Sequence, residues 1–558
     1  MLVLEYKIDY RSSSQVYEKI FLKTLQEFGL EGKIFRDGFL LQCYVAVKES
    51  AIDELEVFVE TFSKRLPYSI FLHKTEVVSV VEIPKKDSLV LDKRKVPLPF
   101  CLDCLADVSN EKSENYYNIF TACKVCGYDV TGEAKNYKKD FVTLAQKIKE
   151  KQIVQIDTFY GRYNVGLPCE ICNSVAYDLL VYDYATVKKY TDSQEYEYNA
   201  LASFEKPLVK LKTNLQFKSN YDSLQKELLR FKLPDDFILH LLMEELHKLE
   251  EDILFITQEA IAFDTTVSFF PEQESIEPIE VVVSEKNSVV VKGEKGIPEF
   301  PVEIESVVPA VGALYSIIKE HKLKDENIVG IYLSKEYNNS IIVYGKKYGV
   351  VEYLSLRFTF QSIAELFEQM QENETAARLL KNYREKFPEL YEKIITFSWE
   401  DANLSIYRIW GIIAIILGYS EDLDIIKGSQ IIENNNLSFL GKKGPRIDYK
   451  LEKINDKVTM NPLLIIQSAM SFRLAGVDEL TLSYGIMESF VEFLSNELDT
   501  IKNSMGVTAV AVAGSLLENK KLFARLDLDC SINHQVYYNN ELPVDGRNIF
   551  YGDSPKVD

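Results

Sequence analysis

The sequence predicts a multidomain α/β protein. Its 558 residues are enough for three or four domains of ordinary size. Residues 1–83 alternate predicted strands and helices, four cysteines from Cys101 to Cys126 have zinc-site spacing, and a Pro- and Glu-rich stretch at 270–301 divides the remaining sequence. We therefore expect four domains. They occupy residues 1–83, 84–135, 136–275 and 300–558.

Charge and hydropathy argue against two classes of partner. With 64 Lys and Arg against 85 Asp and Glu, the net charge of −21 repels a phosphate backbone, so we expect no nucleic acid. The longest apolar run, Ile409–Tyr419, has 11 residues, whereas a membrane helix needs about 20. The first residues include acidic side chains and lack the basic start of a secretory signal. We expect a cytoplasmic protein that does not insert into membranes.

Residues 1–83 have the order β-α-β-β-α-β, judged from helical spacing and strand-like alternation of apolar residues. The predicted elements are a strand at Leu2–Asp9, a helix at Gln15–Phe28, a hairpin at Lys33–Val47, a helix at Glu54–Leu66 and a strand at Ser69–Val80. This order is the ferredoxin-like split βαβ.

The same segment resembles an acylphosphatase domain, in which a glycine-rich loop before the first helix binds an anion with backbone N–H groups and an arginine. Here the loop Ser13–Lys19 contains no glycine, Lys19 stands at the arginine position, and Arg36 lies near the position of an assisting asparagine. We expect the scaffold to be kept without the phosphate site. A small packed domain without chemistry accounts for these residues, because a fold alone does not carry a function.

Two C-x-x-C pairs give the strongest motif in the chain. Cys101 and Cys104 are separated by eighteen residues from Cys123 and Cys126, which fits the four-cysteine zinc pattern. Four thiolates close a tetrahedral structural site with no open position, so we expect Zn²⁺ to hold structure here. Two disulfides or four reduced core thiols are the alternatives, and disulfides are rare in a reducing cytosol.

Residues 136–275 return to α/β character. Buried strands are predicted at Lys151–Phe159 and Asp252–Gln258, and a helix at Phe237–Leu249. Cys169 and Cys172 form a C-x-x-C without a matching pair, and we interpret them as ordinary thiols, with a redox pair or a half-lost metal knuckle as the alternative. His240 and His247 share a helical face without a third ligand, so we interpret them as surface or packing residues.

Residues 300–558 begin with a three-stranded meander at Asn327–Leu356. The predicted helices are Ser362–Gln371, Ala376–Glu385, Ile406–Leu417, Pro462–Phe472 and Glu479–Asn503. A buried strand at Thr508–Gly514 then runs into Gly514-Ser515 at a helix start. This order suggests an actin-like, two-lobed ATPase architecture, in which strand turns and helix N-termini present backbone N–H groups to phosphates.

Taken together, the order of domains resembles the HypF family, the carbamoyltransferase of [NiFe]-hydrogenase maturation. PFCLDCLAD with TACKVCG is similar to the family's zinc finger, and KQIVQIDTFYGRYNVGLP and SFEKPLVKLK resemble parts of its YrdC-like domain. Near the end, AVAGSLLENKKL and NNELPVDGRNIFYG resemble two loops of its actin-like domain. The resemblance covers nearly the whole chain.

The resemblance implies a three-step chemistry in full members of the family. Carbamoyl phosphate is hydrolysed at the first domain, and carbamate is adenylated with ATP in the YrdC-like domain. The carbamoyl group is then transferred at the actin-like domain to the C-terminal cysteine of a partner protein, and it later becomes cyanide on the hydrogenase iron. Such transfer needs a cationic, N–H-rich phosphate cradle.

This sequence departs from the family pattern at each centre. Asp157 stands at the position of a lysine in the YrdC-like domain, and Thr257-Gln258-Glu259-Ala260 replaces the family's Thr-Ser-Ala-Asn. The family's HHHAH and DGTGYG motifs and its second zinc finger are not found. Gly514, Asn519, Asp545 and the adjacent Gly546 match second-lobe nucleotide and metal loops, and the alternative for Asp545 is a turn residue.

We therefore expect a non-catalytic relative of the carbamoyltransferase that resembles the shorter, HydE-type hydrogenase-formation proteins. It would bind a hydrogenase subunit or maturation protein, carry structural Zn²⁺ and not bind ATP. One alternative is an active ATP-dependent carbamoyltransferase whose Gly514, Asn519 and Asp545 hold nucleotide or metal. Another is a zinc-stabilised interaction scaffold unrelated to hydrogenase.

Overall fold

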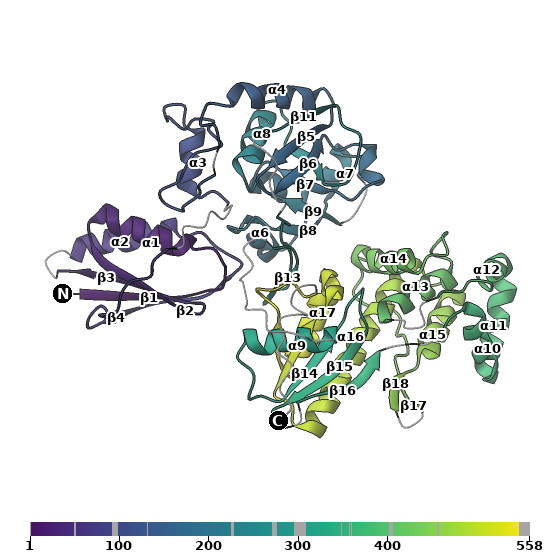
Figure 1. The fold of residues 1–558 in the computed structure, drawn as a ribbon. Helices are drawn as coiled ribbons and strands as arrows, with labels where there is room; N and C mark the ends of the chain where they lie inside the picture. The colour runs from purple at the N-terminus through teal and green to yellow at the C-terminus, as the bar shows by residue number, and fades with distance from the viewer. Residues whose placement is uncertain are drawn as a thin grey trace. The chain divides into compact units, whose positions relative to one another are not determined.

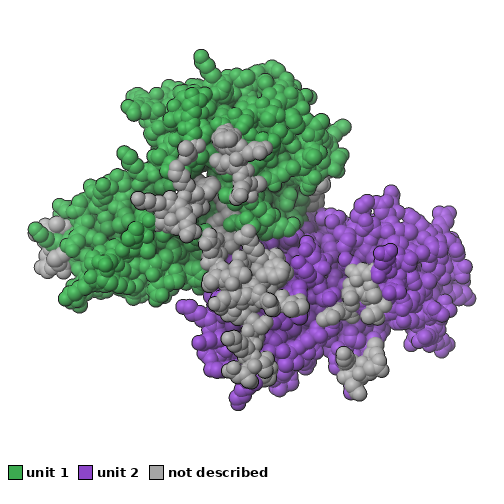
Figure 2. Space-filling model, viewed as in Figure 1, with its two compact units in different colours: residues 1–281, 292–299 green, residues 282–291, 300–558 purple. Residues whose placement is uncertain are grey.

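The chain forms two compact units (Figure 2). Unit 1 comprises residues 1–281 and 292–299, and unit 2 comprises residues 282–291 and 300–558. The computed structural model describes residues 2–48, 52–91, 99–130, 132–224, 228–269, 276–294, 308–347, 349–356, 358, 360–400, 405–454 and 457–545. Gly546 lies outside the described residues. The four domain boundaries stay predictions.

An antiparallel four-stranded sheet begins unit 1, in the strand order β2-β3-β1-β4. Its elements are β1 (Leu2–Tyr10), α1 (Val16–Phe28), β2 (Glu31–Asp37), β3 (Leu40–Val47), α2 (Ile52–Arg65) and β4 (Leu72–Val80). Both helices lie on one face of the sheet (Figure 1). The rings of Phe21 and Phe62 meet edge to face at 5.2 Å, and Tyr6 packs on Phe62 at the same distance. The predicted β-α-β-β-α-β order is confirmed.

A short cysteine-bearing segment with the helix α3 (Leu102–Ser109) leads to a nine-stranded sheet in the order β11-β5-β6-β10-β7-β9-β8-β12-β13. The strands are β5 (Val154–Thr158), β6 (Gly161–Gly166), β7 (Asp178–Val181), β8 (Leu208–Lys212), β9 (Leu228–Lys232), β10 (Ile253–Thr257), β11 (Thr265–Val267), β12 (Glu280–Val283) and β13 (Ser288–Lys292). The helices are α4 (Lys138–Lys149), α5 (Tyr184–Tyr190), α6 (Glu195–Ala202), α7 (Leu215–Asn220), α8 (Phe237–His247) and the 3-10 helix η2 (Glu170–Asn173).

Glu205 joins two segments of unit 1 that lie far apart in sequence. Its carboxylate accepts hydrogen bonds from the Ser69 hydroxyl at 2.5 Å and from the Ile70 N–H at 3.1 Å. The neighbouring Phe204 N–H donates to the Tyr68 carbonyl at 2.7 Å. Glu205 is only 3% exposed. The loop after α6 therefore fastens the N-terminal sheet to the nine-stranded sheet through buried polar contacts.

Unit 2 contains a seven-stranded sheet in the order β17-β18-β16-β15-β14-β19-β20. The strands are β14 (Ile328–Tyr332), β15 (Asn339–Gly345), β16 (Gly349–Leu356), β17 (Leu451–Ile454), β18 (Lys457–Met460), β19 (Ala509–Ala513) and β20 (Gln535–Tyr538). The predicted meander is present as antiparallel β14, β15 and β16, and β19 pairs in parallel with β14.

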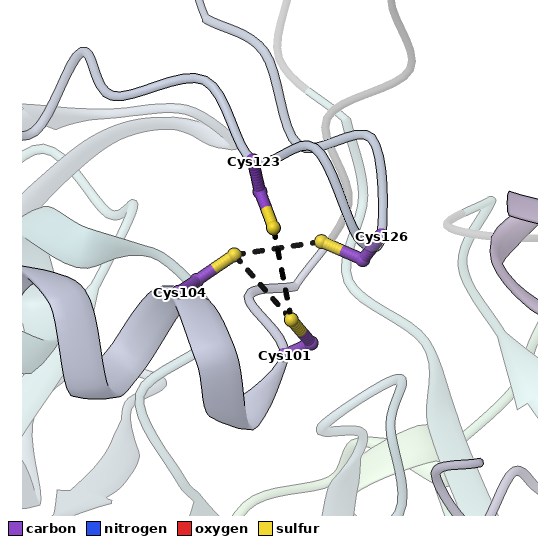
Figure 3. Close-up of side chains that lie close together, drawn as sticks. All are labelled: Cys101, Cys104, Cys123 and Cys126. Carbon is purple, nitrogen blue, oxygen red and sulfur yellow. Dashed lines mark hydrogen bonds between the residues drawn. The ribbon is translucent and has the colours of Figure 1, made fainter. Parts of the chain in front are cut away.

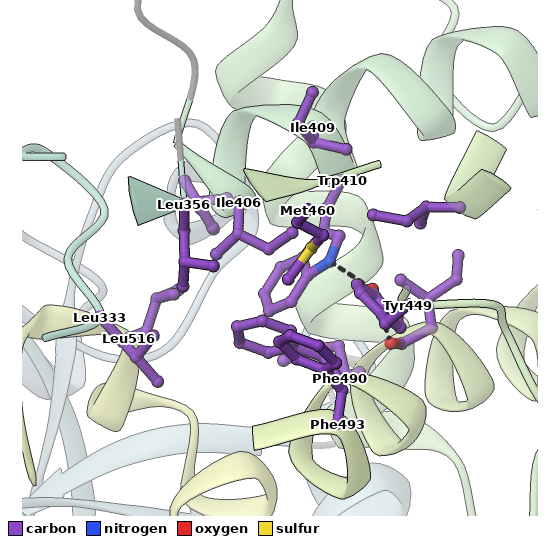
Figure 4. Close-up of a cluster of buried hydrophobic side chains, with 14 of the residues drawn as sticks. Leu333, Leu356, Ile406, Ile409, Trp410, Tyr449, Met460, Phe490, Phe493 and Leu516 are labelled. Atoms are coloured by element: carbon purple, nitrogen blue, oxygen red, sulfur yellow. Dashed lines mark hydrogen bonds between the residues drawn. The ribbon is translucent and has the colours of Figure 1, made fainter. Parts of the chain in front are cut away.

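Helices cover this sheet and supply most of the core. They are α9 (Pro309–Glu320), α10 (Ile363–Gln371), α11 (Glu374–Lys386), α12 (Pro388–Ile394), α13 (Ile406–Leu417), α14 (Ile425–Ser438), α15 (Pro462–Leu474), α16 (Glu479–Met505), α17 (Lys520–Ser531) and the 3-10 helix η3 (Ser515–Glu518). Trp410 of α13 is fully buried and donates its indole N–H to the Tyr449 hydroxyl at 3.0 Å (Figure 4). The long apolar run is thus a core helix. No helix in the described ranges is long and apolar enough to cross a membrane.

Candidate functional site

The four predicted zinc ligands converge on one point (Figure 3). Their sulfur atoms all lie within 4.8 Å of one another. The Sγ–Sγ distances are 3.6 Å for Cys101–Cys104, 3.9 Å for Cys101–Cys123 and 3.5 Å for Cys104–Cys126. A zinc ion that binds four thiolates at about 2.3 Å places them about 3.8 Å apart in a regular tetrahedron. The spacing fits a tetrahedral metal and is too long for disulfides.

Local structure explains this convergence. Cys101 precedes α3, and Cys104 lies in its first turn. The second pair lies in a tight turn in which the Gly127 N–H donates to the Cys123 carbonyl at 3.1 Å and the Val125 N–H points at the Cys123 sulfur at 3.3 Å. Gly127 has φ +77°, which favours glycine at this position.

The thiols influence one another's protonation. Hydrogen bonding with Cys101 lowers the pKa of the Cys123 thiol, while hydrogen bonding with Cys101 raises the pKa of Cys104. The four thiols therefore do not ionise together easily, and a bound divalent cation would favour their joint ionisation. Among the described residues, this is the one group of His, Cys, Asp and Glu side chains placed to hold a metal.

The second C-x-x-C does not form a metal centre within the described ranges. Cys172 is buried, and burial raises the pKa of its thiol to about 11. Cys169 is half-buried before η2. His240 is 9% exposed and packs beside Phe100, and His247 stacks on Tyr182 with ring centroids 4.1 Å apart. These contacts agree with the interpretation of the two histidines as surface or packing residues, since His240 is buried and His247 is 49% exposed.

In the N-terminal domain, Arg36 extends toward the loop backbone at Tyr10 and Ser12, where the resemblance to acylphosphatase would place an anion. Its guanidinium donates to the carbonyls of Tyr10 at 2.8 Å and Ser12 at 3.2 Å, and it pairs with the carboxylate of Glu18 at 2.5 Å. Glu18 is fully buried, and burial raises the pKa of this carboxyl while Arg36 opposes the shift. Arg36 is thus committed to an internal carboxylate and two backbone carbonyls.

Asp157 has a partner in the adjacent strand. It lies opposite Arg162 in the β5–β6 register, and the two side chains form an ion pair at 2.6 Å. Asp157 is 7% exposed. The carboxylate at the family's lysine position is therefore neutralised by a neighbouring cation.

A cavity of about 330 Å³ lies beside the end of β10 in unit 1. Thr257, Gln258, Glu259 and Ala260, which the sequence matches to a family motif, all line it. Arg230 also lines the cavity, where it pairs with Asp178 at 2.6 Å and with Glu280 at 3.3 Å. Burial raises the pKa of Asp178 to about 6. Most of the charged groups in this lining are thus acidic, which opposes phosphate.

In unit 2 the predicted nucleotide-loop residues gather around the turn after β19. Gly514 adopts φ +113°, and a Cβ there would lie 2.2 Å from the Leu333 carbonyl oxygen. Asn519 is fully buried and accepts hydrogen bonds from the Lys521 and Leu522 N–H groups at the start of α17. Asp545 accepts from the Ser515 N–H at 2.8 Å. The structure therefore brings Gly514 and Asp545 to the same turn and makes Asn519 a helix cap.

The sequence did not indicate a buried lysine at this turn. The Lys335 ammonium pairs with Glu433 at 3.0 Å and with Glu518 at 2.9 Å, and the Lys335 N–H donates to the Ser515 hydroxyl at 2.9 Å. Burial lowers the pKa of Lys335, but the two carboxylates outweigh that effect and raise it overall. The lysine and its two carboxylates thus form an ion-pair cluster next to Ser515.

A second cavity, of about 230 Å³, lies in unit 2 among α14, α16 and α17. Tyr484, Met487 and Leu522 contribute to its walls, and Lys521 and Arg525 add positive charge. Asn436 lines it, is only 2% exposed and has a side-chain oxygen without a hydrogen-bond partner. This cavity can accept a small planar group that donates a hydrogen bond.

Comparisons with known proteins agree with the resemblance seen in the sequence. No family model matches the chain. Protein HydE of Wolinella succinogenes is 25% identical over 512 residues, which cover 88% of this chain and 90% of HydE.

Two solved structures of HypF have the same fold. Full-length HypF in its phosphate- and nucleotide-bound form has a TM-score of 0.65 and 16% identity, and the match covers 99% of this chain and 97% of that one. HypF of T. kodakarensis has a TM-score of 0.71 and 12% identity, with 99% and 98% covered. The chain therefore has the HypF fold along almost its whole length and a sequence related to that of HydE.

Proposed function

We propose that this chain acts in hydrogenase maturation as a non-catalytic relative of HypF that binds a hydrogenase subunit or another maturation protein. One observation carries the proposal. Near each position where the resemblance to HypF would place a phosphate, two or more side chains of this chain form an ion pair with each other. The pairs are Arg36 with Glu18, Arg162 with Asp157, and Lys335 with Glu433 and Glu518.

The energetics of these pairs oppose phosphate binding. An incoming phosphate would have to compete with carboxylates that are already in contact with the cations, and the Arg36–Glu18 pair has little access to water, whereas Arg162 is 46% exposed. Separating a buried ion pair leaves an uncompensated charge, which costs about 3–5 kcal/mol. A phosphate that must first separate such an ion pair binds weakly. Repulsion between the phosphate and the displaced carboxylate weakens the binding further.

The proposed role in hydrogenase maturation is supported by sequence similarity to HydE and by the fold shared with HypF. The match to HydE spans most of both chains, so the proposal covers the whole protein and not one domain. We place the chain in the reducing cytoplasm, where its four clustered thiols stay available to Zn²⁺. The partner remains defined by class, as a protein of the hydrogenase assembly pathway.

An active ATP-dependent carbamoyltransferase is the second candidate. The cavity lined by Asn436 and Tyr484 favours it, because an unpaired amide oxygen beside an aromatic wall suits a nucleobase. The Lys335 ion pairs weigh against it, because they occupy the turn at Gly514-Ser515 where the phosphates would lie. Base binding without phosphate binding would give nucleotide affinity without turnover.

Calorimetric titration of the zinc-loaded protein with ATP and with carbamoyl phosphate tests the proposal, with AMP and pyrophosphate release assayed in the same samples. We expect no release of either product and no heat with carbamoyl phosphate. Adenosine serves as the matched ligand without phosphates, and equal affinity for adenosine and ATP would mean that the phosphates add nothing to binding. Sustained AMP and pyrophosphate release would establish the transferase instead.

The partner class is tested by affinity purification of the tagged chain from cells that are producing hydrogenase. We expect a hydrogenase subunit or maturation protein among the bound proteins, and reconstitution of that pair from purified components. Failure of every purified hydrogenase subunit and maturation protein to bind would contradict the proposed role.

A further inference from the structure

Lys19, which the sequence matches to an anion-binding arginine, lies against the zinc-binding turn instead. A Cβ built on Gly127 would lie 2.4 Å from the Lys19 Cδ and 2.5 Å from its Nζ. The lysine side chain therefore occupies the space that any side chain at position 127 would need. Lys19 comes from the first turn of α1, so this contact joins the N-terminal domain to the cysteine-bearing segment.

Among the described residues the Lys19 ammonium forms no ion pair or side-chain hydrogen bond, although its charge helps to lower the pKa of the adjacent Glu18 carboxyl. Neighbouring charges on α1 are committed elsewhere, since Glu18 pairs with Arg36 and Lys23 lies 3.6 Å from Glu27. Lys19 is nevertheless half-buried. A half-buried cation without an ion-pair partner is stabilised by any nearby negative charge.

Four zinc-bound thiolates supply such a charge. A Zn²⁺ ion with four thiolate ligands carries a formal charge of about −2. Gly127 follows Cys126 directly, and its N–H donates to Cys123 at the start of the same turn. A cation resting on this turn attracts the negatively charged zinc–thiolate centre and so raises metal affinity, as groups outside the ligand shell commonly do.

We propose that Lys19 is a positioning residue for the zinc centre and that zinc binding, through this contact, helps to hold α1 of the N-terminal domain in place. The contact is reciprocal, because a cation that strengthens zinc binding is itself held more tightly when zinc is bound. The proposal concerns the structural metal and does not depend on the proposed maturation role.

Competition with a chromophoric zinc chelator tests the proposal in the full chain. Lys19→Met should weaken zinc affinity about tenfold, in line with other groups outside the ligand shell. Lys23→Met is the matched control, one turn further along α1 and paired with Glu27, and it should leave zinc affinity unchanged. Lys19→Arg should keep most of the affinity, because it retains the charge.

Equal zinc affinity of Lys19→Met, Lys23→Met and the unchanged protein would overturn the proposal. An equal loss in Lys19→Met and Lys19→Arg would also overturn it, because shape and not charge would then be responsible. Circular dichroism of each variant establishes that it is folded before the titration.

Hydrogen exchange gives a readout that does not involve affinity. Zinc removal should speed amide exchange in the first turns of α1, and Lys19→Met should reduce the difference between the zinc-loaded and zinc-free forms. Glu205→Gln, which loosens the separate contact at Ser69, should leave zinc affinity unchanged. Unaltered exchange in α1 after zinc removal would contradict the second half of the proposal.

Discussion

Lys335 shows how the chain stabilises a buried cation. Its side chain is 20% exposed, and Glu433 and Glu518 are less exposed still. Lys335→Met would leave two carboxylates without their cation, so we expect the free energy of unfolding of unit 2 to fall by about 3 kcal/mol. Urea denaturation followed by tryptophan fluorescence, which reports on buried Trp410, measures this loss.

An exposed pair provides the control for this variant. Lys346 pairs with Asp325 at 2.6 Å, but both side chains are largely exposed to water. Lys346→Met should leave the stability of unit 2 nearly unchanged. A loss in Lys335→Met no larger than that in Lys346→Met would show that the buried pairs do not stabilise the fold.

His240 gives unit 1 a pH dependence. Burial lowers the pKa of His240 to about 4, against about 6.5 in an unfolded chain. As the pH falls from about 6.5 to about 4, the unfolded chain takes up a proton that the folded chain does not, so stability is complete above this window and falls by about 3 kcal/mol across it.

The substitution His240→Gln removes the contribution of His240 to the pH dependence of stability. We expect the variant to lose less stability than the unchanged protein between pH 6.5 and 4.5, as measured by urea denaturation at each pH. Asp178 and Asp236, whose pKa values burial raises to about 6, change stability in the opposite direction but equally in both proteins. Parallel pH profiles would show that His240 is already charged in the folded chain.

The sequence predicted single residues well where one motif brought them together. The four cysteines were found because C-x-x-C spacing is a local signal. The ion pairs of Lys335 were not found, because Glu433 and Glu518 are 98 and 183 positions away and nothing local marks them. Tertiary charge pairing leaves no periodic pattern in a sequence.

Helices α13 and α14 cross closely because each contributes a glycine. A Cβ on Gly411 would lie 2.0 Å from the Ile425 carbonyl oxygen, and one on Gly428 would lie 2.6 Å from the Gly411 carbonyl oxygen. Small residues let two helix backbones approach more closely than side chains otherwise permit. The crossing places Glu433 of α14 within reach of Lys335.

Gly411→Ala should therefore destabilise unit 2, although alanine favours helices. We expect a loss of about 2 kcal/mol, since the helices must move apart or strain, as measured by urea denaturation. Asn434→Ala, on the exposed side of α14, is the control and should be neutral or slightly stabilising. A stabilised Gly411→Ala would mean that the two helices separate freely.

Element boundaries were predicted closely where caps mark them. The predicted helix Ile406–Leu417 matches α13, which is capped by Ser405 and ends at Gly418 with φ +73°. The predicted helix Phe237–Leu249 ends two residues later than α8, and the strand predicted from Ser69 starts later as β4 at Leu72. Ser69 instead turns its hydroxyl toward Glu205, a contact that strand alternation cannot reveal.

At the scale of the whole molecule, the four-cysteine cluster that we expect to bind Zn²⁺ belongs to one unit only. Cys101 to Cys126 lie in unit 1, so removal of zinc should destabilise that unit and leave unit 2 unaffected. We expect the chelated protein to unfold thermally in two transitions, of which the first shifts to lower temperature. Differential scanning calorimetry with and without chelator measures the shift.

The double variant Cys101→Ser with Cys104→Ser should reproduce the effect of the chelator. Cys169→Ser with Cys172→Ser is the matched control, because these residues form a C-x-x-C without a metal cluster in the described structure. Retained zinc content and an unchanged first transition in the Cys101 and Cys104 variant would refute the zinc assignment.

The order of the chain's segments was predictable because each carries its own periodicity or motif. The contacts that join them were not, since Lys19 on Gly127 and Glu205 on Ser69 are single pairings between distant stretches. The sequence therefore predicts the parts of unit 1 better than their assembly.

Glu205 also limits how the protein can be divided or exchanged with its relatives. A fragment that stops before residue 91 would keep the Ser69 hydroxyl and the Ile70 N–H but lose the carboxylate that both of them contact. If only the N-terminal domain were exchanged between homologues, the incoming domain would have to provide hydrogen-bond donors for the carboxylate of Glu205, which lies 135 positions after Ile70. Residues 69, 70 and 205 thus have to stay compatible, so the N-terminal domain and its distant carboxylate have to be changed together.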